Sequence, residues 1–292
     1  MSEKEYLGIS VVSTVRDVAK NLRKNVLQLR NSLGFFSQQV WIVAESDSSD
    51  NTLEELERLS IEFNDFRYLT LGNLQSSIPE RTIRIAKSRN RAFELMSSYP
   101  ENDYPYVLLA DLDGRNIDIS QSAIKSCFAL SSWDMCAANQ LGPYYDIWGL
   151  RHEIWSPNDC WNSYRELKDV LGELNARKVL ISSKMIHLEP NQAPIRVQSA
   201  FGGLALYRRS VLKGQYYSET LVDGQEVCDH VDLNVRLSTL GYRLLINPKM
   251  INKVTFPNLR TFFSSPRITL IWFARAISYK VQIFFSRQKT TC

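Results

Sequence analysis

Residues 106–114 read YVLLADLDG, a short hydrophobic run that ends in two aspartates and a glycine. Such a run is typical of a buried strand, because it is apolar throughout and is followed by turn-forming residues. In an open α/β sheet the ligand crevice lies at the carboxyl ends of the strands. Asp111 and Asp113 leave the strand at that edge, so they can converge on one hard divalent cation. A solvated turn is the alternative interpretation.

The sequence before this run alternates between strand and helix patterns. Strands are predicted from apolar or β-branched runs at 8–15, 40–44, 66–71 and 106–110. Helices are predicted over 18–33, from Leu53 onward, and over 80–96. Asp17 is expected to cap the start of the first helix, and Gly34 is expected to end it. This alternation predicts an α/β fold with a mainly parallel sheet and helices on both faces.

The sequence after the run is less regular. Residues 143–194 are rich in Trp, Tyr and Asn, and we expect a long insertion beside a site. A strand with a kink at Gly202 and Gly203 is predicted over 197–207, followed by a helix over 226–240 and a last strand over 242–246. The two glycines either let the backbone approach a ligand closely or form a bulge.

Composition bounds the class of protein. The 292 residues are 44% hydrophobic and 23% charged, which excludes collagen, coiled-coil and disordered classes. A net charge of +4 is too small for a dedicated nucleic-acid binder, so no nucleic-acid partner is expected. No apolar run is long enough to predict a spanning helix. Five cysteines without a CxxC pair and a polar N-terminus favour a reduced, cytoplasmic location.

The positive charge is concentrated at the C-terminus. Residues 233–292 hold ten Lys and Arg and no Asp or Glu. We expect one domain over 1–255 and a basic, aromatic tail over 256–292. The tail suits an anionic membrane surface, which would place the protein on the cytosolic face of a membrane. A helix packed on the sheet is the alternative.

Three further groups of residues are candidates for chemistry. Glu45 and the polar run to Asp50 follow the second strand; Glu45 suits a nucleoside contact, and Asp50 suits capping of the next helix. Arg84 and Arg89 lie on the helix before the DLD strand, where they can pair with a carboxylate or a phosphate, or form a solvated basic face. Glu226, Asp229 and His230 have the spacing of one helical face and can serve as a base and a metal ligand.

Taken in order, these motifs resemble those of GT-A nucleotide-sugar glycosyltransferases over roughly residues 8–250. The motifs are ESDSSDNT at 45–52, AKSRN at 86–90, DLD at 111–113 and DHVDL at 229–233. Together with YDIWGLR at 145–151 and AFGG at 200–203, the sequence looks most like the capsule-associated α-1,3-mannosyltransferases.

The resemblance implies a role for each matching residue. Asp111 and Asp113 would bind Mn²⁺ or Mg²⁺ that bridges the donor diphosphate, with Asp111 also near the ribose. Thr14, Arg16 and Glu45 would contact the nucleoside. Asp229, with Glu226 beside it, would be catalytic. His230 would be a metal ligand, which would point to a retaining outcome.

The function predicted from these residues is metal-dependent transfer of a hexose from a nucleotide-sugar donor. The sugar is expected to be mannose from GDP-mannose, and the acceptor a surface polysaccharide or a lipid-linked glycan. Trp148, Trp155 and Trp161 are candidates either to stack on sugar rings or to fill the core. The alternatives are a sugar nucleotidyltransferase, although residues 13–20 lack its Gly-rich phosphate loop, and a non-catalytic nucleotide-sugar-binding protein.

Overall fold

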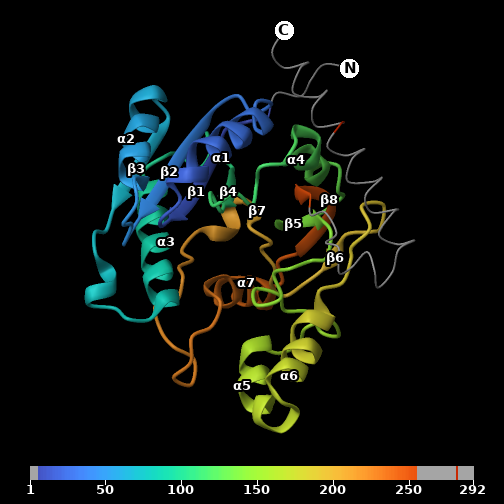
Figure 1. The fold of residues 1–292 in the computed structure, drawn as a ribbon. Helices are drawn as coiled ribbons and strands as arrows, with labels where there is room; N and C mark the ends of the chain where they lie inside the picture. The colour runs from blue at the N-terminus through green and yellow to red at the C-terminus, as the bar shows by residue number, and fades with distance from the viewer. Residues whose placement is uncertain (1–5, 255–280, 282–292) are drawn as a thin grey trace.

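The computed structural model describes residues 6–254 and residue 281 (Figure 1). The N-terminal half consists of β1 (Ile9–Val15), α1 (Ala19–Ser32), β2 (Gln39–Glu45), α2 (Thr52–Glu62), β3 (Phe66–Thr70), α3 (Arg81–Ser97) and β4 (Tyr106–Ala110). The second half consists of α4 (Gln121–Phe128), β5 (Met135–Leu141), α5 (Cys160–Leu171), α6 (Glu173–Leu180), β6 (Ile195–Arg196), β7 (Leu204–Arg208), α7 (Asp229–Thr239) and β8 (Leu244–Val254). The predicted strand–helix alternation is confirmed.

Within the described residues the strands form one sheet in the order β3-β2-β1-β4-β7-β5-β8-β6. The pairs β1–β2, β1–β4, β2–β3 and β5–β8 are parallel. The strand β7 runs antiparallel between β4 and β5, and β6 runs antiparallel to β8 at the edge. The predicted α/β class with a mixed, mainly parallel sheet is therefore confirmed. The carboxyl ends of β1, β2 and β4 meet at one edge, where ligands bind in folds of this kind.

Helices cover both faces of the sheet, as predicted. Successive residues of a strand point to opposite faces, so Val11 packs in one buried cluster and Val12 in the other. The first cluster joins the sheet to α1, α2 and α4 through Leu22, Leu56 and Ile124. Each fully buried leucine of this kind contributes about 1.5–3 kcal/mol.

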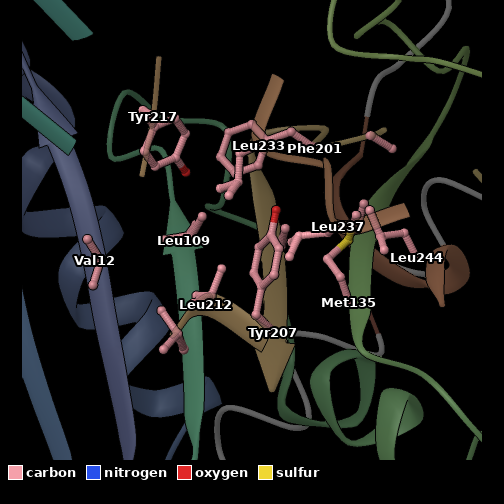
Figure 2. Close-up of a cluster of buried hydrophobic side chains, with 14 of the residues drawn as sticks. Val12, Leu109, Met135, Phe201, Tyr207, Leu212, Tyr217, Leu233, Leu237 and Leu244 are labelled. Carbon is pink, nitrogen blue, oxygen red and sulfur yellow. The ribbon is translucent and has the colours of Figure 1, made fainter. Parts of the chain in front are cut away.

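The second cluster joins the sheet to α3 and α7 (Figure 2). Tyr207 of β7 lies at its centre, beside Leu233 and Leu237 of α7 and Leu109 of β4. The Tyr207 hydroxyl is buried and donates to Asn234 Oδ1 at 2.8 Å, so the only polar atom of this side chain is satisfied. This cluster holds α7 beneath the edge of the sheet that carries Asp111.

The starts of α1 and α2 are linked by Asp50. Its Oδ2 accepts from the Ala19 N–H at 3.1 Å, and its Oδ1 accepts from the Thr52 N–H at 3.0 Å. The N-cap residue of α2 is Asn51, so Asp50 lies one residue before that position, although it accepts from the N–H of the first helical residue as predicted for a capping side chain. Asp17 does not cap α1; its Oδ1 instead accepts from the Ser49 N–H at 2.7 Å. Both contacts tie together the turns that follow β1 and β2.

Three elements after β4 differ from the predictions. The strand predicted over 197–207 is restricted to β7, because Gly202 and Gly203 adopt φ values of +66° and +85° that interrupt an extended chain. The last strand is longer than 242–246 and extends to Val254. The helix predicted over 226–240 begins at Asp229, so Glu226 lies outside it and the prediction of one shared face with Asp229 and His230 is wrong.

The predicted insertion over 143–194 contains the helices α5 and α6, which lie below α7 and apart from the sheet (Figure 1). In the described part of the chain, no helix is both long enough and apolar enough to cross a membrane. The predicted tail over 256–292 lies outside the described residues apart from residue 281, and the domain boundary at 255 stays a prediction.

Candidate functional site

A cleft of about 670 Å³ lies at the carboxyl ends of β1, β2 and β4. The start of α7, one side of α3 and the segment after β5 complete its walls. Eight of the predicted site residues line it: Thr14, Arg16, Arg84, Arg89, Asp111, Asp113, Asp229 and His230. Residues distant in the sequence are thus brought together at the edge that the DLD motif predicts.

The backbone of Asp111 is fixed by the turn that contains Gly202 and Gly203. The Asp111 N–H donates to the Gly203 carbonyl at 2.9 Å. A Cβ atom on Gly203 would lie 3.5 Å from Asp111 Oδ2 and 3.0 Å from the Tyr145 hydroxyl. A side chain at Gly203 would therefore crowd the Tyr145 hydroxyl and the Arg115 Cβ, which lies at 3.2 Å, whereas the distance to Asp111 is an ordinary contact. The close approach of this glycine pair to a ligand stays a prediction.

A buried amide network holds this turn from behind. Asn116 Nδ2 donates to the carbonyls of Asp111 at 2.6 Å and of Gly203 at 2.9 Å. Asn252 Nδ2 donates to Asn116 Oδ1 at 2.8 Å and to the Gly202 carbonyl at 2.9 Å. Asn116 and Asn252 position Asp111 without lining the cleft. Sequence reasoning missed both, since a lone asparagine carries no spacing signal.

Asp113 is the more exposed carboxylate of the pair. Its Oδ1 accepts from the Arg115 N–H at 3.1 Å, and its Oδ2 lies 3.5 Å from Arg115 Nε. The Arg115 guanidinium also stacks 4.5 Å from the Tyr145 ring centre. Asp113 thus faces the solvent side of the cleft, with the Arg115 guanidinium beside it.

Negative charge accumulates in the cleft. Burial raises the pKa of Asp111 to about 7; Asp113, Asp146 and Asp229 add to this shift, and the Arg89 charge opposes it. Burial also raises the pKa of Asp146, although the N–H groups of Gly202 and Gly149 donate to its oxygens at 2.8 and 3.2 Å. A divalent cation would relieve this repulsion.

Arg89 and Asp229 form a buried ion pair across the cleft. Arg89 Nε donates to Asp229 Oδ2 at 2.6 Å, and the guanidinium lies over the rings of Phe201 and Tyr217. Burial disfavours the charged carboxylate, but the Arg89 charge and the Arg89 hydrogen bond outweigh it, and the pKa of Asp229 is lowered. Arg89 therefore holds Asp229 ionised, and the carboxylate partner predicted for Arg89 is found.

His230 is buried and neutral. Its ring stacks on Phe201 with 3.8 Å between centroids, and its Nδ1 lies 3.4 Å from the Tyr217 hydroxyl. Burial, helped by the Arg89 charge, lowers the pKa of His230 to about 3. Its buried Nε2 forms no hydrogen bond within the described residues. A neutral imidazole nitrogen with no partner is a suitable ligand for a metal ion.

The expected divalent metal requires donor atoms that converge on one point. In the part of the chain that the structure describes, no three His, Cys, Asp or Glu side chains converge closely enough to hold an ion. Asp111, Asp113 and His230 are thus not assembled as a three-ligand centre. Mg²⁺ is commonly held by one or two carboxylates together with substrate phosphates. The carboxylate pair at the end of β4 fits that mode of binding.

Arg84 lines the cleft and is bound to its wall through two of its three guanidinium nitrogens. Its Nε lies 3.3 Å from Asp47 Oδ2, and its Nη1 donates to the carbonyls of Ile78 and Pro79. Asp47 adopts φ +62° and accepts the Gln75 N–H at 2.7 Å. Arg84 therefore fixes the turn after β2, whereas the more exposed Arg16 leaves its guanidinium available beside Asp17.

Glu45 and Glu226 do not line the cleft. Glu45 is buried and accepts from the Ser48 N–H and the Thr70 hydroxyl, so it shapes the turn after β2. Glu226 Oε2 accepts from the Thr82 N–H at 2.8 Å and from its hydroxyl at 2.9 Å, at the start of α3. Both carboxylates support neighbouring segments instead of facing the cleft.

Aromatic side chains from the insertion complete one wall. Tyr145, Asp146 and Trp148 line the cleft, and all three belong to the YDIWGLR motif at 145–151. Trp155 and Trp161 do not line it; Trp155 Nε1 donates to the Lys184 carbonyl, and Trp161 packs against Tyr164. Trp148 Nε1 is buried and without a hydrogen-bond partner among the described residues.

No protein-family model matches the sequence, and no curated protein sequence matches it. Among solved structures, the mannosyltransferase PcManGT from Pyrobaculum calidifontis, in complex with GDP-Man and Mn²⁺, is 16% identical, with a TM-score of 0.49. TarS from S. aureus in complex with UDP-GlcNAc is 14% identical, with a TM-score of 0.46. Glucosyl-3-phosphoglycerate synthase from Mycobacterium tuberculosis in complex with UDP is 13% identical, with a TM-score of 0.40.

Each of these alignments covers 94% of this chain. The chain spans 66% of the length of PcManGT and of TarS, and 82% of the synthase. These values describe a likeness in chain path and do not define an activity. The resemblance to the capsule-associated α-1,3-mannosyltransferases stays a prediction.

Proposed function

We propose that this chain is a metal-dependent glycosyltransferase that binds a nucleotide-sugar donor in the cleft. The observation that carries the proposal is the placement of Asp111 and Asp113 in one cleft with Arg16 and Arg81, at the carboxyl ends of parallel strands. A carboxylate pair that binds a cation, beside arginines that bind phosphate, suits a nucleoside diphosphate group.

Asp111 and Asp113 are the residues that would hold Mn²⁺ or Mg²⁺, and the ion when bound neutralises the departing diphosphate. His230 stays a candidate for a further ligand: its Nε2 forms no hydrogen bond among the described residues and lies 3.9 Å from Asp229 Oδ2, but His230 does not converge with Asp111 and Asp113. Arg16 and Arg81 lie at the cleft where they can contact phosphate oxygens. Thr14 lines the same cleft and stays a candidate for a nucleoside contact. Glu45 would influence nucleoside binding only by shaping the turn after β2.

Two carboxylates can orient an acceptor hydroxyl. Asp229 is the one that the sequence predicts, but it is already paired with Arg89. Asp146 lies in the same cleft and forms no ion pair within residues 6–254, and its oxygens are held by two backbone N–H groups. We therefore propose that Asp146 accepts the hydrogen bond of the acceptor hydroxyl, while Asp229 keeps Arg89 and α7 in place.

The donor sugar proposed is a hexose, with mannose from GDP-mannose as the first candidate. The proposed acceptor is a surface polysaccharide or lipid-linked glycan on the cytosolic face of a membrane, reached through the basic tail over 256–292. Liposome flotation tests the attachment: the full chain should float with anionic vesicles at low salt, and a chain that ends at Lys253 should not. Equal flotation of both chains would contradict it.

The experiment that tests the activity is a donor panel with and without Mn²⁺. Hydrolysis of each nucleotide sugar by the purified protein is measured by release of nucleoside diphosphate. The panel includes GDP-Man and UDP-GlcNAc, and the product anomer is determined by NMR. Metal-dependent turnover of one donor supports a transferase, whereas formation of a nucleotide sugar from a sugar phosphate would show a nucleotidyltransferase.

A further inference from the structure

A second cavity of about 950 Å³ lies between α5 and the outer face of α7. We call it the α5–α7 groove. Its walls come from residues 157–166, from residues 214–227 and from one side of α7. The α7 residues that face it are Val231, Asp232, Val235, Arg236 and Thr239, followed by the C-cap residue Leu240. They lie on the side of α7 opposite to the buried Leu233 and Leu237, so the groove and the hydrophobic core share one helix.

The groove combines an aliphatic floor with a polar rim. Val222, Val227, Val231 and Val235 supply the floor. Asn158 and Gln215 lie on the rim, and their side-chain amides form no hydrogen bond within the described residues. Tyr216 adds an exposed ring, which is fixed from one side by the Arg236 guanidinium at 4.6 Å from its centre. A ligand with both apolar faces and hydroxyl edges fits these walls.

Charges in the groove are largely neutralised by each other. Arg151 Nη2 donates to Asp159 Oδ2 at 2.7 Å, and both side chains are buried. Arg236 pairs with Asp232 one turn earlier on α7. Glu166, at the outer edge, is the one lining charge without an ion pair within residues 6–254. The ligand that suits the groove is therefore polar but uncharged.

The groove is connected to the cleft through shared segments. Val227 lines the groove, and the next residue, Cys228, lines the cleft. Arg151 Nη1 donates to the Trp148 carbonyl at 2.9 Å, and Trp148 lines the cleft. The Asp159 partner of Arg151 also caps α5 through the N–H groups of Trp161 and Asn162. A molecule bound in the groove would therefore lie against the same walls that form the reaction centre.

We propose that the α5–α7 groove binds a neutral oligosaccharide, namely the part of the acceptor glycan that does not react. Sugar rings present C–H faces to the aliphatic floor and to Tyr216, and hydroxyl groups to the free amides of Asn158 and Gln215. The identity of this oligosaccharide as the acceptor rests on the proposed function, but its binding to the groove does not.

The test is binding of the full chain to an array of neutral, acidic and lipid-conjugated oligosaccharides. Wild type should retain neutral oligosaccharides. The double variant Asn158→Ala/Gln215→Ala should bind them about tenfold more weakly, because two hydrogen bonds are lost. The matched control is Asn191→Ala/Gln198→Ala, which removes the same two residue types from exposed positions outside both cavities. Its affinity should equal that of wild type.

Each other outcome overturns the inference. Retention of acidic glycans only, no retention of any neutral glycan, or equal weakening in the control would each exclude a neutral glycan groove. Binding that is lost in Asp146→Asn but kept in the groove variant would place the glycan in the cleft instead. The two proposals can be distinguished by their outcomes. Glycan binding without turnover of any donor would contradict the proposed transferase activity. Turnover without glycan binding would contradict the proposal that the groove binds a glycan.

Discussion

Arg89 on α3 donates a hydrogen bond of 2.6 Å from Nε to Oδ2 of Asp229, the first residue of α7. Both side chains are at most one-tenth exposed, so neither charge is compensated by bulk water. The contact joins the helix before the DLD strand to the helix below the cleft. Of the two partners that the sequence allows for Arg89, a carboxylate or a phosphate, the structure shows the carboxylate.

Arg89→Ala should lower the free energy of unfolding by about 3–5 kcal/mol, because Asp229 would stay buried without its partner. The matched control is Arg91→Ala on the same helix, where an exposed arginine pairs with Glu94. That variant should change stability by no more than about 0.5 kcal/mol. Urea unfolding followed by circular dichroism measures both, and equal stability of the two variants would contradict the role of the pair.

The ion pair also predicts a pH dependence of stability. The folded-state pKa of Asp229 lies below its unfolded value, so the stabilisation is present above the unfolded pKa and is lost as the pH falls through the folded pKa. Wild type should therefore exceed Asp229→Asn in stability at neutral pH, and the difference should shrink in acid. Thermal unfolding from pH 7 to pH 3 measures it. A difference that grows as the pH falls would reverse the assignment.

Gly203→Ala should impair both stability and donor turnover. The φ of +85° disfavours any side chain, and the new Cβ would lie 3.0 Å from the Tyr145 hydroxyl. Gly241→Ala is the matched control, because its φ is +90° and nothing lies within 4 Å of the added Cβ. Both variants should lose about 1–2 kcal/mol from backbone strain. Only Gly203→Ala should also slow turnover, because it crowds the Tyr145 hydroxyl in the cleft, and equal activities of the two variants would contradict this.

Asp146→Asn should lower kcat for transfer by at least about tenfold with little change in donor affinity, if Asp146 orients the acceptor hydroxyl. Asp229→Asn should act mainly on stability, as argued above. Steady-state kinetics with the active donor separates the two. A large loss of kcat in a stably folded Asp229→Asn protein, with Asp146→Asn near wild type, would return the hydroxyl-orienting role to Asp229.

The regular half of the fold is readable from the sequence because its signals are local. The strands that carry Val11, Val43 and Leu109 are mainly apolar or β-branched runs, and α1 and α3 have apolar residues at helical spacing. Likewise Asp111 and Asp113 could be placed, since the end of a predicted parallel strand fixes the edge of the sheet at which they lie.

Other features could not be read in this way because they depend on tertiary contacts. Glu226 has helical spacing to Asp229, but its carboxylate is used to bind Thr82 on another element. Positive φ at Gly202 and Gly203 is invisible to hydrophobic patterns, so β7 was predicted too long. Asp146 joins the cleft only through the fold of an insertion whose helices bury little more than Cys160 and Ala176, and such segments give weak periodic signals.

The central claim is that Asp111 and Asp113 serve a metal-dependent step on a nucleotide-sugar donor. It is tested most directly by release of nucleoside diphosphate from the donor panel over a Mn²⁺ titration, in wild type and in Asp113→Ala. Asp113 is exposed and makes few contacts, so the variant should fold as wild type does. We predict turnover of one donor that requires Mn²⁺ in wild type and is abolished in Asp113→Ala. Turnover that is unaffected by removal of metal, or retained with the same Mn²⁺ dependence in Asp113→Ala, would contradict the account.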